Sequence, residues 1–363
     1  MNKKERELKR SLNKTDRKKI SSKKRNVQCQ DKERLLKTAG RFFCEVRKER
    51  LYMSEKKFGR FEECDRHDFP DGIVSVTEEQ FGGEATLILM GEKTVLHDCG
   101  MAYAAEDTIS SLRNKLNGRP LDYILVSHSH YDHIGAMPYI KKAFPEVKVC
   151  GSEYAKFVFS RSGALDMMEE LGRAAAQQYG TGNEEITARG MDVDIVLKDG
   201  DDLDIGNGHF IRALETKGHT DCAMTYVVEP EKIMFTSEST GICVGPEKTE
   251  VAILKSFEDS MESLEKCRSY GAKRIISPHF GIVPESYNEE YWNVFEKMAW
   301  NEREYVVGMW NSGMTPQEML DKASKEVFDS NRSSEQPYEA FIANAKVIIK
   351  LYEQYADKHN TKG

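Results

Sequence analysis

The amino-acid sequence predicts a layered α/β fold followed by a helical C-terminal region. Short apolar runs bounded by turn residues recur from Ile73 to Ser277, and stretches with helical spacing separate many of them. No strand pattern returns after Pro284, where three helical stretches follow one another. Because alternating strands and helices are typical of sheets covered by helices, we expect a central layered domain with helices appended to its C-terminal end.

The N-terminal region differs from the rest of the chain in charge. Residues 1–25 hold 12 Lys and Arg against 3 Asp and Glu, whereas the whole chain carries a formal charge of −7. A basic arm on an acidic body can bind nucleic acid or a membrane surface, but no aromatic side chain lies among these charges to stack on bases. We therefore interpret residues 1–30 as a solvated, partly disordered arm, followed by a helix within 31–57 and a polar loop over 58–71.

The order of elements in the remaining chain follows from apolar runs and turn signals. We expect strands over 73–77, 85–90, 94–96, 123–126, 147–150, 194–197, 209–215, 224–228, 232–236 and 274–277. Helical spacing predicts helices over 105–116, 134–145, 164–179 and 258–269, and then over 286–311, 315–328 and 336–356. Thr315 is expected to cap a helix that has Pro316 at its first position.

The composition is that of a soluble globular protein. Of the 363 residues, 39% are hydrophobic and 31% are charged. The sequence contains no run of about 18 apolar residues, so it predicts no membrane span. The basic N-terminus lacks the apolar core of a secretory signal. The 8 cysteines are scattered singly, which favours free thiols and a cytoplasmic location over a disulfide framework.

A histidine-rich loop is the strongest chemical signal in the chain. The apolar run over 123–126 reads as a buried strand, and His128, His130, Asp132 and His133 follow it within a few residues. Side chains on a tight loop after a strand can converge on one point, whereas on a regular strand they would alternate between two faces. Imidazole and carboxylate groups are ligands for zinc, iron and manganese. The loop therefore predicts a metal site.

Four further candidates each follow a predicted strand. His219 lies in a Gly-His-Thr segment, Glu238 follows the strand over 232–236, and His279 follows the strand over 274–277. Asp98 lies upstream of the histidine-rich loop, after the strand over 94–96. Placement at strand ends is consistent with a shared site, because strand ends can meet at one edge of a layered fold.

The motif His-x-His-x-Asp-His after an apolar strand resembles the signature of the metallo-β-lactamase superfamily. The later Gly-His-Thr segment, the acidic residue Glu238 and the late His279 match the family's order of motifs across about residues 72–284. The resemblance implies a four-layer αββα fold over 72–284. Residues 1–71 would then form a basic N-terminal arm and helix, and residues 285–363 a helical C-terminal extension that caps the site.

The resemblance also implies two metal sites. His128, His130 and His219 would bind the first metal, Asp132, His133 and His279 the second, and Glu238 would bridge them. Asp98 would support the site from outside by a hydrogen bond to a ligand. Two divalent metal ions are expected, with zinc favoured and iron or manganese as alternatives. A hydroxide bridging them would attack the substrate, and Asp132 would act catalytically by passing a proton to the leaving group.

Four departures from the family pattern limit the resemblance. The usual bridging residue is Asp, whereas this chain has Glu238. Asp221 stands where many members have Pro, and Ala223 stands where glyoxalase II has a second histidine. Cys99 replaces the commoner Thr of the turn after Asp98, and we interpret it as a small buried thiol.

The favoured function is a binuclear metal-dependent hydrolase of the glyoxalase II or lactonase-like branch. It would cleave an ester-like bond, namely a thioester, lactone or carboxyl ester, in a small molecule. A di-iron oxidoreductase or oxygenase on the same fold is the main alternative, and a nucleic-acid phosphodiesterase is a weaker one. The expected partner is a small-molecule substrate, with no membrane, nucleic acid not favoured, and a homodimer left open.

Overall fold

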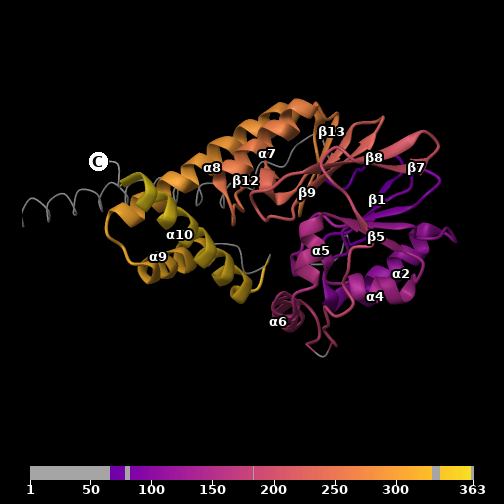
Figure 1. Ribbon diagram of the computed structural model, residues 1–363, viewed down its shortest axis with the longest axis horizontal. Coiled ribbons are helices and arrows are strands. Elements are labelled where there is room, and N and C mark those ends of the chain that lie inside the picture. Colours follow the sequence, from indigo (N-terminus) through magenta and orange to yellow (C-terminus); the bar gives the residue numbers. More distant parts are fainter. Residues whose placement is uncertain (1–65, 78–81, 183, 329–335, 361–363) are drawn as a thin grey trace, which may run out of the picture.

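The computed structural model describes residues 66–77, 82–182, 184–328 and 336–360. The basic arm, the helix expected within 31–57 and most of the loop expected over 58–71 lie outside these ranges. The described part contains two six-stranded sheets, a small two-stranded sheet, and helices packed around them (Figure 1). The predicted α/β fold with a helical C-terminal region is confirmed.

The first sheet is built from the N-terminal half of the described chain. Its strands, in spatial order, are β1 (Ile73–Ser75), β2 (Thr86–Ile88), β3 (Val95–His97), β4 (Tyr123–Leu125), β5 (Lys148–Gly151) and β6 (Ile195–Val196). β1, β2 and β3 pair antiparallel, whereas β3 to β6 pair parallel. Parallel neighbours need crossover connections. These connections contain α2 (Ala105–Leu116), α3 (Tyr131–Ile134), α4 (Met137–Ala143), α5 (Glu153–Phe159) and α6 (Ser162–Tyr179).

The second sheet is mostly antiparallel. Its strands, in spatial order, are β14 (Gly281–Val283), β13 (Arg274–Ser277), β10 (Ile233–Phe235), β9 (Met224–Glu229), β8 (His209–Glu215) and β7 (Asp202–Gly206). β10 and β13 are its parallel pair, and the connection between them contains α7 (Phe257–Tyr270). The small sheet is the hairpin of β11 (Ile242–Gly245) and β12 (Lys248–Glu250).

Alternate residues on the central strands face different layers. On β4, Ile124 packs in one core cluster with Leu112 of α2, whereas Leu125 packs with Phe235 of β10 in the core between the sheets. On β10, the neighbouring Met234 faces outward into a third cluster that contains residues of α7 and α8. Because strand side chains alternate with a period of two, this pattern places helices on both outer faces of a double sheet. The fold is therefore the expected αββα arrangement.

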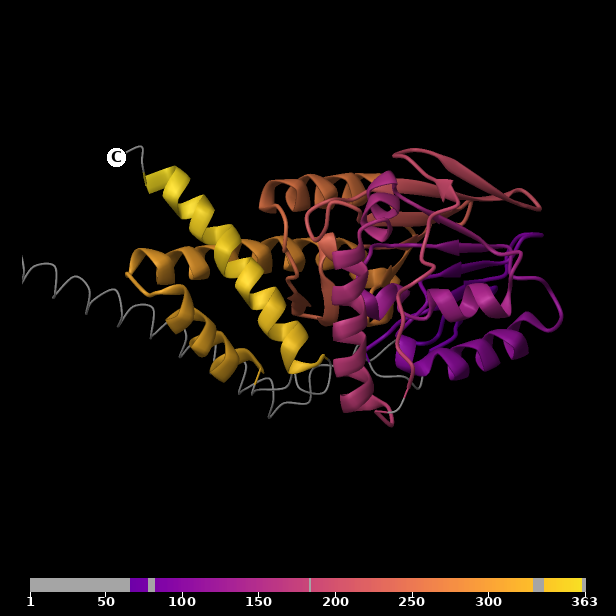
Figure 2. The same ribbon diagram turned by 60° about the horizontal axis from the view of Figure 1, so that its bottom comes forward.

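Helices α8 (Asn288–Asn311), α9 (Pro316–Ala323) and α10 (Tyr338–Asn360) form the C-terminal region. They share a hydrophobic cluster with the outer face of the second sheet. Thr315 caps α9 through a capping box with Glu318, and Pro316 begins the helix, which confirms the predicted start. α10 lies beside α6, and its Ala340 packs into the core of the first half (Figure 2). No described helix is both long and apolar enough to cross a membrane.

The helix predicted over 134–145 is present as the shorter α4, and the separate helix α3 precedes it and shares only Ile134 with the predicted range. The carbonyl oxygen of His133 accepts hydrogen bonds from the backbone N–H groups of Cys99, at 2.6 Å, and Gly100, at 3.1 Å. That carbonyl therefore lies against the turn after β3, and the helix does not continue through this segment. These two hydrogen bonds hold the histidine-rich loop against the turn that carries Asp98.

Candidate metal centre

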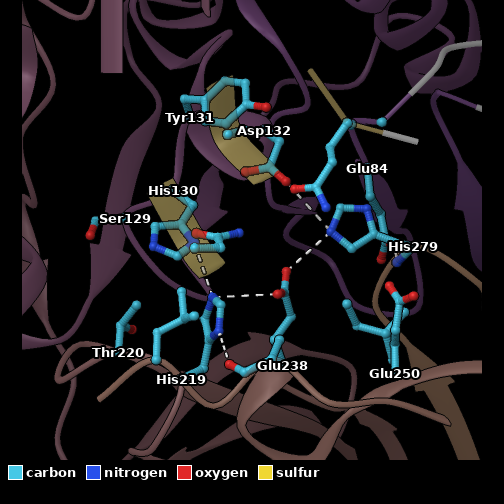
Figure 3. Close-up of a pocket in the computed structure, with 18 of the residues that line it drawn as sticks. Glu84, Ser129, His130, Tyr131, Asp132, His219, Thr220, Glu238, Glu250 and His279 are labelled. Atoms are coloured by element: carbon cyan, nitrogen blue, oxygen red, sulfur yellow. Dashed lines mark hydrogen bonds and ion pairs between the residues drawn. The ribbon is translucent and has the colours of Figure 1, made fainter. Parts of the chain in front are cut away.

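The strand order brings the candidate residues to one edge of the double sheet. In the first sheet, β3 and β4 are parallel, so the loops that carry Asp98 and His128 leave at the same end. In the second sheet, β8, β10 and β13 run in the same direction. Their ends are followed by His219, Glu238 and His279, respectively. The site therefore lies between the ends of the two sheets (Figure 3).

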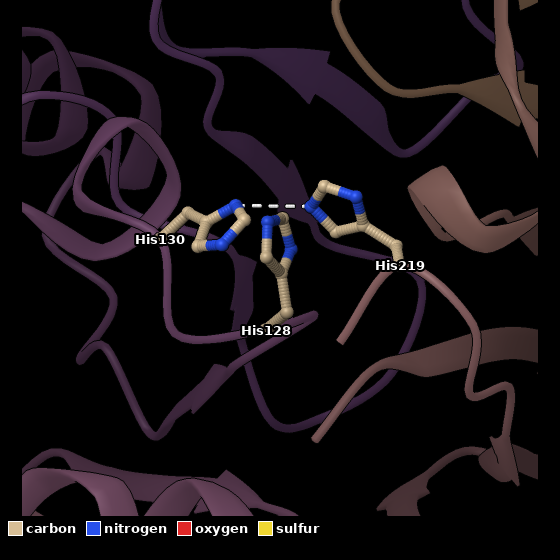
Figure 4. Close-up of side chains that lie close together, drawn as sticks. All are labelled: His128, His130 and His219. Atoms are coloured by element: carbon tan, nitrogen blue, oxygen red, sulfur yellow. Dashed lines mark hydrogen bonds between the residues drawn. The ribbon is translucent and has the colours of Figure 1, made fainter. Parts of the chain in front are cut away.

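Three histidines form the first donor group. One ring nitrogen from each of His128, His130 and His219 lies within 4.8 Å of the others (Figure 4). The Nε2 atom of His219 lies 2.9 Å from Nδ1 of His130. The opposite nitrogen of His219, Nδ1, lies 2.5 Å from the carbonyl oxygen of Ala252. Since a carbonyl only accepts, Nδ1 carries the proton, and the lone pair of Nε2 points into the group.

One nitrogen of the first donor group, on His128, lacks a hydrogen-bond partner from the protein. The side chain is buried, and its Nε2 atom has no hydrogen-bond partner among the described residues. Its other nitrogen, Nδ1, lies 3.0 Å from the hydroxyl of Ser127. A buried polar atom without a partner is costly and needs an explanation, and a metal ion would satisfy it.

Burial keeps two histidines of the first group in their ligand form. Burial and the neighbouring histidines lower the pKa of His128 well below its ordinary value. Burial, together with the neighbouring His219, lowers the pKa of His130 to about 3. Both imidazoles are therefore neutral near pH 7, which is the form that binds metal.

Asp132, His133, Glu238 and His279 form the second donor group. The Nε2 atom of His133 lies 2.7 Å from Oε1 of Glu238 and 3.0 Å from Nε2 of His279. Oδ2 of Asp132 lies 3.6 Å from Nε2 of His279 and 3.9 Å from Nε2 of His133. All four side chains thus direct donor atoms toward a common point.

Glu238 lies between the two groups. Its Oε1 faces His133 and His279, whereas its Oε2 lies 3.3 Å from Nε2 of His219 in the first group (Figure 3). Burial alone would raise the pKa of Glu238, but the neighbouring His219 and hydrogen bonds to His133 and His279 hold it well below its ordinary value. The carboxylate is therefore ionised and offers one oxygen to each group.

Asp98 supports the second group from outside. Its Oδ2 lies 2.8 Å from Nδ1 of His133, which leaves Nε2 of His133 free to face the donor group. The carboxylate also accepts hydrogen bonds from the backbone N–H of Ser127 at 2.8 Å and from the Ser127 hydroxyl at 2.6 Å. Asp98 thus orients a histidine and fixes the start of the histidine-rich loop, as expected of a residue behind the ligands.

Glu84 is a site residue that sequence reasoning missed. Its carboxylate accepts a hydrogen bond from the backbone N–H of His279 and lies beside that histidine in the pocket (Figure 3). His279 adopts a left-handed backbone conformation with φ +58°, which is uncommon for residues other than Gly, so this hydrogen bond helps to hold it. The sequence marks the neighbouring Gly82 and Gly83 as a turn, but gives no signal for the carboxylate.

The donor set fits a pair of metal ions. Imidazole nitrogens and carboxylate oxygens suit zinc, iron and manganese. Nitrogen separations of 2.9 Å in the first group and 3.0 Å in the second are near the spacing of about 3.3 Å expected between ligands of a tetrahedral zinc ion. Together with the unpartnered nitrogen of His128, this geometry makes the two groups a candidate binuclear metal site.

A cavity of about 810 Å³ opens from this site. His130, Asp132, His219, Glu238 and His279 line one part of it. Side chains of α6 and α10 line another part. The donor atoms are therefore accessible to a small molecule.

The matched family decides the identity of the domain. Residues 80–279 match the family described as the metallo-beta-lactamase superfamily. The chain belongs to this superfamily. Its members are mostly metal-dependent enzymes, so the superfamily and the donor geometry agree on a metal-dependent site.

Two relatives of the chain are informative. The chain is 28% identical over 231 residues to the metallo-beta-lactamase fold-containing protein ST1585 of Sulfurisphaera tokodaii. This match covers 62% of this chain and 82% of that protein. The crystal structure of ST1585 superposes with a TM-score of 0.48 at 24% identity, covering 62% of this chain and 86% of the other.

The second relative is the anaerobic nitric oxide reductase flavorubredoxin of Escherichia coli K12, which is 24% identical over 204 residues. The match covers 56% of this chain but only 36% of flavorubredoxin. The chain therefore spans about a third of the length of this relative.

Proposed function

We propose that this protein is a binuclear metal-dependent hydrolase that cleaves an ester-like bond of a small molecule: a thioester, a lactone or a carboxyl ester. The observation that carries the proposal is the position of Glu238. Its carboxylate faces two groups of donor atoms, and both groups open onto one large cavity. Such a site can hold two metal ions next to a bound substrate.

The candidate ligands would form two metal-binding sets. His128, His130 and His219 would hold one ion, and Asp132, His133 and His279 the other, with Glu238 between them. When bound, a pair of divalent ions activates water as a nucleophile near neutral pH and polarises the carbonyl oxygen of a substrate. Burial lowers the pKa of His128 and His130, and outer hydrogen bonds fix the direction of His133 and His219.

Asp132 is the proposed proton carrier. Its side chain is 21% exposed, lines the cavity and belongs to the second donor group. A carboxyl group at that position can reach both the donor atoms and a substrate in the cavity. Asp132 would pass a proton to the leaving alcohol or thiol, which makes that group easier to expel.

A di-iron oxidoreductase is the second candidate, because one relative is named a nitric oxide reductase. The same donor types suit iron. Reduction of nitric oxide needs a supply of electrons, however, and the described residues after the metal domain form the helices α8 to α10. The hydrolase needs only water as co-reactant, and we favour it for that reason.

Metal analysis combined with parallel assays would test the proposal. Protein purified without chelators or added metal is expected to contain about two metal ions per chain. It should hydrolyse members of a panel of thioesters, lactones and carboxyl esters, lose this activity with a chelator, and regain it with zinc. Glu238→Gln should lower the metal content toward one ion per chain.

Glu250→Gln is the matched control, because Glu250 also lines the cavity but belongs to neither donor group. This variant should keep both ions and full turnover. Fully metal-loaded protein that hydrolyses no member of the panel, but consumes oxygen or nitric oxide with iron and a reductant, would favour the oxidoreductase instead.

A further inference from the structure

Part of the cavity wall is formed by one stripe from each of two helices. From α6, the lining residues Gly163, Ala164, Met167, Met168 and Leu171 recur at helical spacing. From α10, the lining residues Ala340, Ala343, Asn344 and Val347 do the same. None of these nine side chains is charged, so the wall can receive an uncharged group without removing ions from water.

The charged residues of the two helices do not line the cavity. The α6 stripe is interrupted in sequence by Asp166, Glu169 and Glu170. The α10 stripe is preceded by Glu339 and interrupted by Lys346, and none of these charged residues is among the lining residues. Helical geometry separates the two sets, because residues three or four apart share a face. The apolar wall is therefore a continuous feature of both helices.

Two large apolar side chains in this wall stay open to solvent. Met167 is 55% exposed and Val347 is 43% exposed, and both line the cavity. α6 and α10 lie side by side (Figures 1 and 2). Both residues line the same cavity as the donor groups. Exposed apolar surface that is continuous with a polar site is typical of a ligand-binding pocket.

We propose that the α6–α10 wall binds a flexible, uncharged acyl chain of the substrate. The inference rests on the proposed hydrolase for the position of the acyl carbonyl at the donor groups. Methionine side chains adapt to varied apolar shapes, and the small Ala340 and Ala343 leave room beside them. The substrates are therefore esters or thioesters of medium-chain acids, with the chain along the wall and the carbonyl near Glu238.

The reaction balances with water as the co-reactant. The oxygen of water forms a bond to the acyl carbonyl carbon, and the bond from that carbon to the alcohol oxygen or thiol sulfur breaks. The leaving group takes a proton. The products are the free acid, whose chain lies on the α6–α10 wall, and an alcohol or thiol.

Binding of uncleaved acyl chains would test the wall separately from catalysis. Straight-chain amides from butanamide to octanamide would compete with a dansyl-labelled octanamide, and displacement would be followed by fluorescence of the metal-loaded protein. Each added methylene should tighten binding by roughly threefold to fourfold, as expected for burial of one methylene. Met167→Glu and Val347→Glu should flatten this dependence on chain length, whereas Met167→Leu should retain it.

Phe157→Glu is the matched control, because Phe157 is 52% exposed, lies on the neighbouring α5 and does not line the cavity. It should keep the wild-type dependence. Binding that does not change with chain length, or an equal loss in Phe157→Glu and Met167→Glu, would overturn the acyl-chain proposal. If the amides bind with the expected length dependence while no ester is cleaved, the wall is supported and the proposed hydrolase fails instead.

Discussion

At the scale of single residues, two of the candidate metal-binding imidazoles are oriented by a partner on their far side. The Nδ1 atom of His219 faces the carbonyl oxygen of Ala252, and that of His133 faces Asp98. These contacts fix which nitrogen carries the proton and leave the other nitrogen as a donor. Such outer partners affect metal binding as well as ring orientation.

Asp98→Asn should weaken the second metal site. In the wild type, Oδ2 of Asp98 faces Nδ1 of His133, and Oδ1 accepts a hydrogen bond from the backbone N–H of Ser127. An asparagine has only one oxygen, so if it accepts from His133, its NH₂ group faces the N–H of Ser127, and two donors then face each other. One of these hydrogen bonds is therefore lost. We expect metal affinity at the second site to fall by about 10-fold to 100-fold, measured by competition with a chromophoric chelator.

Asp122→Asn is a suitable control for this substitution. Asp122 is a partly buried carboxylate that pairs with Lys93 and accepts a hydrogen bond from the backbone of Thr94, away from the donor groups. This variant should bind both metal ions as the wild type does. Unchanged affinity in Asp98→Asn would show that Asp98 has no role in the metal site.

Asp132→Asn should separate ligation from proton transfer. At saturating metal, we expect turnover of an ester with an alkyl alcohol leaving group to fall by about 10²-fold or more, because the leaving alkoxide needs a proton. Turnover of the matching p-nitrophenyl ester should fall much less, since its leaving group is stable without a proton. An equal decrease for both esters would mean that Asp132 acts as a ligand and not as a proton donor.

At the scale of elements, the start of α7 positions the His219 loop. The carbonyl oxygen of Gly218 accepts hydrogen bonds from Lys255, at 2.9 Å, and Ser256, at 3.1 Å. Gly218 has φ +132°, and a Cβ atom there would lie 2.6 Å from the Cα atom of Ser260 in α7. Glycine is therefore required on both conformational and steric grounds.

Gly218→Ala should destabilise the protein and weaken the first metal site together. Strain at such a backbone position is expected to lower the free energy of unfolding by about 1–3 kcal/mol, and the clash with α7 adds to it. Urea unfolding and metal stoichiometry would measure the two effects. Gly271→Ala is the control, because Gly271 also has a positive φ of +71° but would place its Cβ in open space.

Only Gly218→Ala should alter metal content. If Gly271→Ala also lost the metal, the effect would come from general destabilisation and not from the position of His219.

Elements with a strong periodic pattern were predictable, and those defined by tertiary contacts were not. The amphipathic helices α2, α6 and α7 lie within a few residues of their predicted bounds. The short helix α5 and the strands β7, β11, β12 and β14 were missed. The strand β7 contains one fully buried residue, Ile205, and carries charged side chains at Asp202 and Asp204, so its pairing with β8 is decided by the sheet and not by its own composition.

The same distinction applies to the candidate site. Side chains that lie directly after apolar strands, such as His128 and His279, could be identified from sequence because the strand end places them. The carboxylate of Glu84 reaches His279 across 195 positions of the chain, and the acceptor for His219 is a backbone carbonyl. No residue type or spacing encodes such contacts, because they depend on how the two sheets pack.

At the scale of the whole molecule, the donor atoms are divided between the two sheets. The histidine-rich loop follows β4 of the first sheet, whereas His219, Glu238 and His279 follow strands of the second. Each donor group combines residues from both sheets. Bound metal ions would therefore link the two halves of the fold at the edge where the cavity opens.

Metal removal should consequently lower the stability of the whole molecule. A ligand present at 100 times its dissociation constant stabilises the folded state by about 2.7 kcal/mol, provided that the unfolded chain does not bind it. For a domain of this size, that corresponds to a decrease in Tm of roughly 5–10 °C per site on chelation. Thermal unfolding with and without a chelator would measure the shift.

The division of donors between the sheets also predicts which segments become more mobile when the metal is removed. On chelation, hydrogen exchange should accelerate in residues 126–136 of the first half and in residues 216–219 and 277–281 of the second, because the links between these loops are lost. The double variant His130→Ala/His279→Ala removes one ligand from each group, so its Tm should not respond to the chelator. A shift of equal size in this variant would show that the chelator acts elsewhere, and no shift in the wild type would show that the loops are held by protein contacts alone.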